Sequence, residues 1–155
     1  DFSFPEWNVR RFPRDKSLTD TELGLQVLKE RGCDRVVIAG GGGGRLDHIL
    51  HIVGLFERMT LSICCVTAAE HVEVIRGTDV FAGLIGQTVS FIALSAVAEI
   101  EYSQGLRLPL DGMRWTPGEG GVSNIITSTP FKVHVVSGAV LMVRMLSSTD
   151  SPLPP

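Results

Sequence analysis

The sequence predicts an N-terminal α/β domain with a parallel sheet, followed by a small β-sandwich domain. In the first half of the chain, strand-like and helix-like segments alternate, which is typical of an α/β layer with right-handed crossovers. Beyond about residue 77 the helical period disappears and short β-rich runs are separated by Gly, Pro and Asn. We therefore expect an α/β nucleotide-binding domain over 1–77, a β-sandwich over 78–148 and a disordered tail over 149–155.

The α/β domain is expected to begin with an extended segment and a helix. Residues 8–12 form an extended, strand-like stretch. Thr19 is a good N-cap residue, and Glu22 three positions later completes a capping box. These signals predict a helix over about 20–31 that Gly32 ends.

The next strand and helix flank a run of glycines. Residues 35–39 are apolar and β-branched, which suits a parallel strand buried on both faces. Five glycines follow at 40–44, and apolar residues then recur at helical spacing from Leu46 to Phe56. Residues 61–66 are typical of another strand. The glycine run is therefore predicted at the carboxyl end of one strand and the start of a helix.

The second half of the chain contains segments that favour strands and show no helical period. Their number is too small to close a large barrel, so we expect a small sandwich, which a partner chain can complete. The predicted strands cover residues 88–94, 97–102, 131–136 and 139–145.

Composition excludes several classes of function. The chain has 155 residues, with 14 Lys and Arg against 17 Asp and Glu, so it offers no broad basic face for nucleic acid or an anionic membrane. No apolar run approaches the roughly 20 residues that span a bilayer, and the first residues lack signal-peptide character. Three cysteines fit buried thiols in a reducing compartment. We expect a cytoplasmic protein that binds small molecules.

The glycine run and the residues after it form the first candidate site. Glycines let the backbone approach an oxyanion, and the helix start offers free N–H groups and a positive dipole end. A P-loop and a Rossmann fingerprint are both excluded, because Arg45 stands where each motif requires another residue. Arg45 can donate to phosphate oxygens, and Asp47 can hold a ribose hydroxyl, a metal-bound water or Arg45 itself. The alternative is a flexible turn with a weak surface ion pair.

The start of the first helix is the second candidate site. In this architecture it lies at the same sheet edge as the glycine run, where α/β proteins bind ligands. Asp20 can hold Mg2+ on phosphates there, and Lys16 can contact the phosphates directly. Alternatively, Asp20 only complements the helix dipole. The basic residues nearby, namely Arg10, Arg11, Arg14 and Lys16, form either a solvated strand end or a polyphosphate contact.

The histidines and cysteines carry weaker signals. His48 and His51 lie three positions apart on one predicted helix, but a pair without a third ligand is more often involved in packing or hydrogen bonding. We therefore assign no metal to them. Cys33, Cys64 and Cys65 are expected to be inert core thiols.

Four segments of the chain resemble one known family. Residues 12–22 (FPRDKSLTDTE) followed by 43–48 (GGRLDH) resemble the central signature of thiamine pyrophosphokinases. Residues 105–110 (GLRLPL) and 121–124 (GVSN) resemble the two later motifs of that family. The similarity covers about residues 8–146. It implies an α/β domain, a C-terminal β-sandwich, and a homodimer that holds thiamine between the α/β domain of one subunit and the β domain of the other.

The resemblance also implies an activity and a set of site residues. Thiamine pyrophosphokinases transfer diphosphate from Mg-ATP to the hydroxyethyl oxygen of thiamine, with AMP as the leaving group. The implied catalytic residues are Asp20, Arg45 and Asp47. Of these, Asp20 would also hold Mg2+. The implied contacts on the ATP side are Lys16, Thr19, Gly43, Gly44 and His48, and those on the thiamine side are Ser123 and Asn124.

The chain departs from the family pattern in two places. The family has an earlier Gly-Asp-x-Asp-Ser stretch whose carboxylates bind Mg2+, and no segment of this chain matches it, so we expect that the family's N-terminal segment is missing. Leu108 stands where members often carry an aromatic residue, for which Trp115 either compensates or is simply core. The alternatives to the enzyme are a non-catalytic dimeric nucleotide- or thiamine-binding protein and a diphosphokinase for another hydroxyl-bearing heterocycle.

Overall fold

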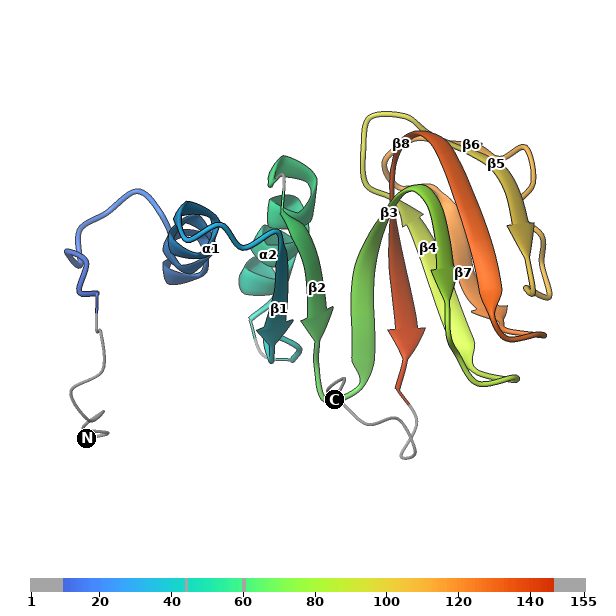
Figure 1. Ribbon diagram of the computed structural model, residues 1–155, viewed down its shortest axis with the longest axis horizontal. Coiled ribbons are helices and arrows are strands. Elements are labelled where there is room, and N and C mark those ends of the chain that lie inside the picture. The colour runs from blue at the N-terminus through green and yellow to red at the C-terminus, as the bar shows by residue number, and fades with distance from the viewer. Residues whose placement is uncertain (1–9, 44, 60, 147–155) are drawn as a thin grey trace.

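The structure is a computed structural model that describes residues 10–43, 45–59 and 61–146. Over these residues two helices lie at one end of an eight-stranded sheet, and the far part of the sheet curls over into a sandwich (Figure 1). In chain order the elements are α1 (Asp20–Glu30), β1 (Arg35–Ala39), α2 (Leu46–Arg58), β2 (Ser62–Val66), β3 (Glu70–Phe81), β4 (Thr88–Ala93), β5 (Ala98–Gln104), β6 (Arg114–Trp115), β7 (Gly120–Ile125) and β8 (Phe131–Met145).

Helix α1 confirms the local signals at both of its ends. The backbone N–H of Glu22 donates to Thr19 Oγ1 at 3.3 Å, and the N–H of Thr19 donates to the Glu22 carboxylate at 2.9 Å, which completes the capping box. At the other end Gly32 has a left-handed φ of +80°. The strand expected over residues 8–12 is wrong for the described residues 10–12, because this segment lies beyond α1, away from any strand with which it could pair (Figure 1). Residues 8 and 9 lie outside the described residues.

Strand β1 is parallel to β2, as predicted, but it is not buried on both faces. The two strands run in register from Arg35 opposite Ser62 to Ala39 opposite Val66. Along β1, exposed and half-buried residues alternate, and the side chain of Val37 is 46% exposed. The reason is that β1 lies at the edge of the described sheet and only Val36 and Ile38 pack against the helical core.

Strands β3 and β8 connect the two halves of the molecule. The strand order is β1-β2-β3-β8-β4-β7, and β5 pairs with both β8 and β6. The sequence prediction missed β3, β6 and β7, and it divided β8 in two at Gly138, whose φ is +76°. Residue 77 lies within β3, at a register shift between Ile75 and Gly77. The division into domains at residue 77 stays a prediction.

Two hydrophobic cores lie on opposite faces of this shared sheet. The sandwich core contains Phe91, Phe131 and Met142, and Trp115 is buried in it. The other core lies between the helices and the sheet, and Leu141 belongs to it. Leu141 and Met142 are successive residues of β8, so their side chains point to opposite faces. The predicted fold class, a parallel α/β unit followed by a small β-sandwich, is confirmed.

The cysteines agree with the sequence prediction only in part. All three are free, and burial raises the pKa of Cys64 and Cys65. The expected core position is confirmed for Cys65 but is wrong for Cys33 and Cys64, which are half-buried, because Cys33 lies between α1 and β1 and Cys64 lies on the face of β2 opposite to Cys65. Within the described residues, neither helix has the length and apolar character needed to cross a bilayer. The tail over 149–155 lies outside the described residues.

Candidate functional site

A cavity of about 560 Å³ lies where the N-terminal ends of α1 and α2 meet. Five residues predicted from the sequence line it, so the structure brings the two helix starts together. Lys16, Thr19 and Asp20 come from the start of α1, and Asp47 and His48 come from the start of α2. Because the N-terminus of a helix carries partial positive charge and unpaired N–H groups, two such ends beside one cavity favour an anionic ligand.

Two further basic residues, Arg14 and His51, line the cavity although the sequence prediction did not assign them to the site. Arg14 belongs to the basic cluster for which the sequence allowed two interpretations, a solvated strand end or a polyphosphate contact. His51 lies on α2 one turn after Asp47. The helical spacing of His48 and His51 indicated that they share a face, which was the available signal for His51.

Asp20 and Lys16 form an ion pair at the mouth of the cavity. Lys16 Nζ lies 2.5 Å from Asp20 Oδ1. The Asp20 side chain is 91% exposed, so solvent or a ligand can reach its carboxylate. An exposed pair of this kind contributes little to stability, so a phosphate or a cation can replace either partner at small cost.

Arg45 and Asp47 form a two-pronged ion pair at the start of α2. Arg45 Nε and Nη2 donate to the two carboxylate oxygens at 3.1 and 2.5 Å, and the N–H of His48 donates to Asp47 at 3.1 Å. The Arg45 guanidinium lowers the pKa of Asp47, and Asp47 in turn raises that of Arg45. Of the two, Asp47 lines the cavity and Arg45 is not among the described lining residues.

The glycine loop borders a different cavity from the one at the helix starts. Gly41 and Gly43 have left-handed φ values of +79° and +81°, and a Cβ on Gly42 would lie 2.4 Å from the Cβ of Thr67. Gly41, Gly42 and Gly43 line an apolar cavity of about 310 Å³ beneath α2. Gly44 lies outside the described residues. The glycines are therefore required by the conformation of the loop itself.

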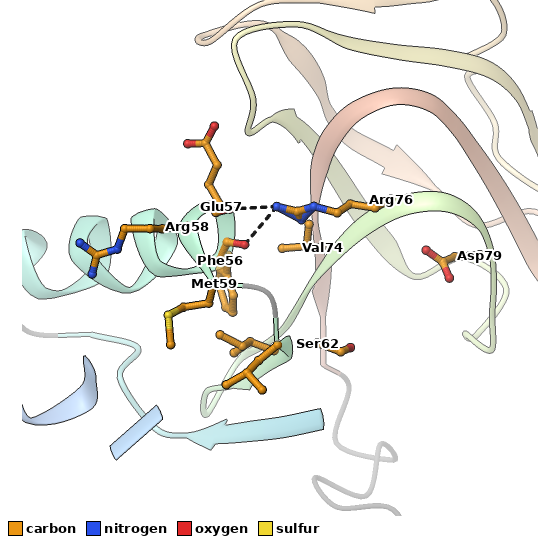
Figure 2. A pocket seen from close by; sticks show the side chains of 10 residues that line it. Phe56, Glu57, Arg58, Met59, Ser62, Val74, Arg76 and Asp79 are labelled. Atoms are coloured by element: carbon orange, nitrogen blue, oxygen red, sulfur yellow. Dashed lines mark hydrogen bonds between the residues drawn. The ribbon is translucent and has the colours of Figure 1, made fainter. Parts of the chain in front are cut away.

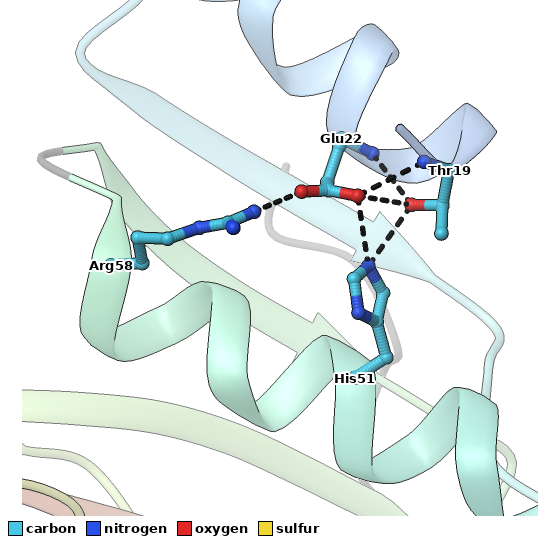
Figure 3. A network of polar contacts seen from close by, with 4 residues as sticks. All are labelled: Thr19, Glu22, His51 and Arg58. Carbon is cyan, nitrogen blue, oxygen red and sulfur yellow. Dashed lines mark hydrogen bonds and ion pairs between the residues drawn. The ribbon is translucent and has the colours of Figure 1, made fainter. Parts of the chain in front are cut away.

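A network of polar contacts joins α1 to α2 beside the main cavity (Figure 3). The Glu22 side chain, in a residue only 4% exposed, pairs with Arg58 and lies 3.2 Å from His51 Nε2. His51 Nε2 is also 3.0 Å from Thr19 Oγ1. The pKa of Glu22 is lowered from 4.5 to about 2, mainly by the hydrogen bond from the N–H of Thr19. Arg58 and the Thr19 hydroxyl lower this pKa further, whereas burial raises it. The expected role of the histidine pair in hydrogen bonding is confirmed for His51.

Another cavity, of about 540 Å³, lies at the opposite end of α2 (Figure 2). Arg76 on β3 donates from Nη2 to the carbonyl oxygens of Phe56 and Glu57, at 3.3 and 3.1 Å. A cation at the C-terminal end of a helix satisfies its last carbonyl groups and complements its dipole. None of the predicted site residues lines this cavity, so Arg76 is best explained as a cap of α2.

Ser123 and Asn124 lie on β7, in the sandwich, separated from β2 by three strands in the sheet order. Asn124 is 1% exposed, and both ends of its amide are hydrogen bonded. Its Oδ1 accepts from the N–H groups of Leu108 and Ile125 at 3.0 and 2.8 Å, and its Nδ2 donates to Leu108 O at 2.7 Å. Ser123 has a φ of +60°, and its N–H donates to Ser90 Oγ at 3.1 Å. Asn124 thus fixes the loop that carries Leu108, which is 58% exposed.

The carboxylates of the main cavity fit a cation that arrives with a nucleotide. Within the described ranges, no group of three or more His, Cys, Asp or Glu side chains is placed to hold a metal ion. Asp20 and Asp47 are the two acidic residues that line the cavity. Mg2+ is usually bound by one or two carboxylates together with substrate phosphates and waters, and this donor set suits such binding.

Comparisons with known proteins find similarity to one family. Residues 3–68, which contain both helices and the glycine run, match the family model described as thiamin pyrophosphokinase, catalytic domain. The resemblance to thiamine pyrophosphokinases is confirmed. Among curated proteins, no sequence matches the chain.

Solved structures of thiamine pyrophosphokinases share the fold. That from Bacillus subtilis superposes with a TM-score of 0.75 at 24% identity, over 85% of this chain and 65% of the other. That from Geobacillus thermodenitrificans gives 0.73 at 25% identity, over 89% and 66%. The yeast enzyme gives 0.60 at 13% identity, over 71% and 39%. The chain thus spans slightly less than two thirds of the length of the two bacterial proteins.

Proposed function

We propose that this chain transfers a diphosphate group from ATP to the hydroxyethyl oxygen of thiamine, giving thiamine diphosphate and AMP. The observation that carries the proposal is the cavity in which Lys16, Asp20, Asp47 and His48 meet at two helix N-termini. Its support from outside the chain is the match of residues 3–68 to the catalytic domain of thiamin pyrophosphokinases. The reaction requires in-line positioning and stabilisation of negative charge, which this cavity is equipped to supply.

The residues of the cavity, together with Arg45, which pairs with Asp47 beside it, have roles that depend on their charge. Lys16 and Arg45 neutralise phosphate oxygens, and each is released for this by exchanging its present carboxylate partner for the ligand. Asp20 would hold Mg2+, which would supply Lewis-acid stabilisation of the transferring group when bound. Asp47 and His48 contact the nucleotide from the start of α2. The free N–H groups of both helix starts add fixed dipoles to these charges.

The thiamine side of the site belongs to the sandwich and to a second copy of the chain. Ser123 and Asn124 lie three strands away from β2, so one chain does not bring them to its own cavity. A homodimer in which the sandwich of one copy faces the helices of the other would bring them together. A cytoplasmic location is part of the proposal, supported by the three free cysteines, which fit a reducing compartment.

One assay tests the proposal directly. The intact natural protein is incubated with ATP, Mg2+ and thiamine, and the product is oxidised to fluorescent thiochrome while AMP is measured in parallel. Equal amounts of AMP and thiamine diphosphate are expected. If the protein binds ATP or thiamine but forms neither product, the enzyme hypothesis is wrong and the chain is a non-catalytic binding protein. AMP release with a different heterocyclic alcohol, and not with thiamine, would identify a related diphosphokinase.

A further inference from the structure

We propose that Glu22 is a positioning residue, whose buried carboxylate clamps α1 to α2 and thereby sets the separation of Asp20 from Asp47 in the cavity. This inference rests on the proposed function, because the clamp acts through the residues assigned to that reaction. It concerns a residue that touches no substrate in the proposed site.

A single carboxylate makes contacts to both helices. On α1, Glu22 Oε2 accepts from the N–H of Thr19 at 2.9 Å and from its hydroxyl at 3.1 Å. On α2, Glu22 Oε1 pairs with Arg58, and Oε2 lies 3.2 Å from Nε2 of His51. Arg58 is the last residue of α2 and His51 lies near its middle, so the carboxylate holds α1 at two points along the second helix (Figure 3).

Apolar packing alone fixes α1 weakly. Of its 11 residues, only Glu22 and Leu25 are buried. Leu23, Val27 and Leu28 are only half-buried, so apolar contacts restrain the position of the helix against its neighbour weakly. The Glu22 side chain is 6% exposed and that of Arg58 is 61% exposed, so removing the charge of Arg58 would leave a buried carboxylate without its ion-pair partner. The network around Glu22 therefore determines where α1 sits.

The clamp lies directly beside the residues that line the cavity. Glu22 is two positions from Asp20, and Thr19, its hydrogen-bond partner, itself lines the cavity. His51 is one helical turn from Asp47 and also lines it. A displacement of α1 along α2 changes the distance between the two aspartates, and a misplacement of about 1 Å can reduce turnover by about a hundredfold.

The ordinary alternative is that Glu22 only caps α1. A substitution by glutamine distinguishes the two roles of Glu22, because glutamine serves in a capping box as well as glutamate does. Glu22→Gln therefore keeps the cap on Thr19 but removes the charge that Arg58 and His51 face. Glu30→Gln on the same helix is the matched control, since it makes the same chemical change in the exposed pair between Arg10 and Glu30.

The test compares these variants in the intact natural protein. We expect Glu22→Gln to lower kcat about tenfold with little change in the KM for thiamine, while far-UV circular dichroism keeps its helical signal. Amide hydrogen exchange should become faster in α1. Arg58→Met should reproduce the loss of kcat and Arg58→Lys should restore most of it, and the double variant of Glu22→Gln with Arg58→Met should be no worse than either single change.

Several results would overturn the inference. It fails if Glu22→Gln keeps kcat within twofold of the natural protein, if its loss equals that of Glu30→Gln, or if the two substitutions at Glu22 and Arg58 add. If the natural protein makes no thiamine diphosphate, the proposed function fails separately. In that case, amide hydrogen exchange in α1 still tests whether Glu22 holds α1 against α2. An exchange rate that is unchanged in Glu22→Gln would show that it does not.

Discussion

The helical end of the molecule and the sandwich place their candidate residues in different ways. In the helical part, exposed charged side chains surround a cavity, and one buried carboxylate between α1 and α2 holds the arrangement together. In the sandwich, a buried neutral amide on β7 fixes the backbone of the Leu108 loop by two hydrogen bonds. The first arrangement depends on charge and the second on hydrogen-bond geometry. Changes in charge should therefore affect the nucleotide end, and changes in shape should affect the thiamine end.

The largest effect is expected when one charge at the helical end is removed. Asp20→Asn in the intact natural protein should lower turnover a hundredfold or more, which corresponds to about 3 kcal/mol of transition-state stabilisation. Asp20 is highly exposed, so the melting temperature should change little. The measurement is AMP release under saturating substrates. AMP production equal to that of the natural protein would remove Asp20 from the mechanism.

The matching change in the sandwich should affect stability and thiamine binding together. Asn124→Ala leaves the N–H and carbonyl of Leu108 without their partners, which should cost about 2 kcal/mol and lower the melting temperature by about 4–8 °C. The KM for thiamine should rise while ATP binding is unchanged. Calorimetry with each ligand checks this. Weakened ATP binding with normal thiamine binding would contradict the division between the two ends.

A change of shape at the helical end provides the reverse test. Gly42→Ala places a Cβ 2.4 Å from that of Thr67, so the loop between β1 and α2 must move, at a cost of about 1–3 kcal/mol. ATP binding should weaken, because α2 begins at the end of this loop. Gly54→Ala, within α2 and with open space around it, should instead be neutral or stabilising by up to about 1 kcal/mol. Thermal unfolding of the two variants, measured side by side, gives the comparison.

The smallest expected effect is the pH dependence of the clamp. The pKa of Glu22 is lowered to about 2 in the folded protein from an ordinary value of 4.5. Its stabilisation is therefore complete above about pH 4.5 and is lost as the pH falls towards 2. Melting temperatures in Mg2+-free buffer should show the natural protein losing its advantage over Glu22→Gln across this interval. A difference that stays constant with pH would show that the carboxylate is not the group responsible.

Local signals allowed much of the fold and of the helical site to be predicted from the sequence. The start of α1 is determined by the capping box, whose two residues Thr19 and Glu22 are only three positions apart. Its end is determined by Gly32. The two helix starts were also predicted to lie together, and in the structure Thr19 Oγ1 lies 3.0 Å from His51 Nε2 of α2. Here a short sequence pattern and the three-dimensional arrangement carry the same information.

Other features depend on contacts that no short pattern records. Strand β3 was missed because a register shift near Gly77 interrupts its alternation. Gly138 within β8 resembled a turn but lies inside a continuous strand. Glu22 and Arg58 are 36 positions apart, so their pairing follows only from the packing of α1 against α2. Asn124 was predicted as a ligand contact, and its hydrogen bonds to the Leu108 loop were not foreseen.

Strand β8 gives the molecule a mechanical property that neither half has alone. Leu141 contributes to the core beneath the helices and Met142 to the core of the sandwich, so pulling this strand out would open both cores at once. The two halves should therefore melt in a single cooperative transition, although their cores lie on opposite faces of the sheet. Damage to the interior of the sandwich would reach the helices through the backbone of one strand.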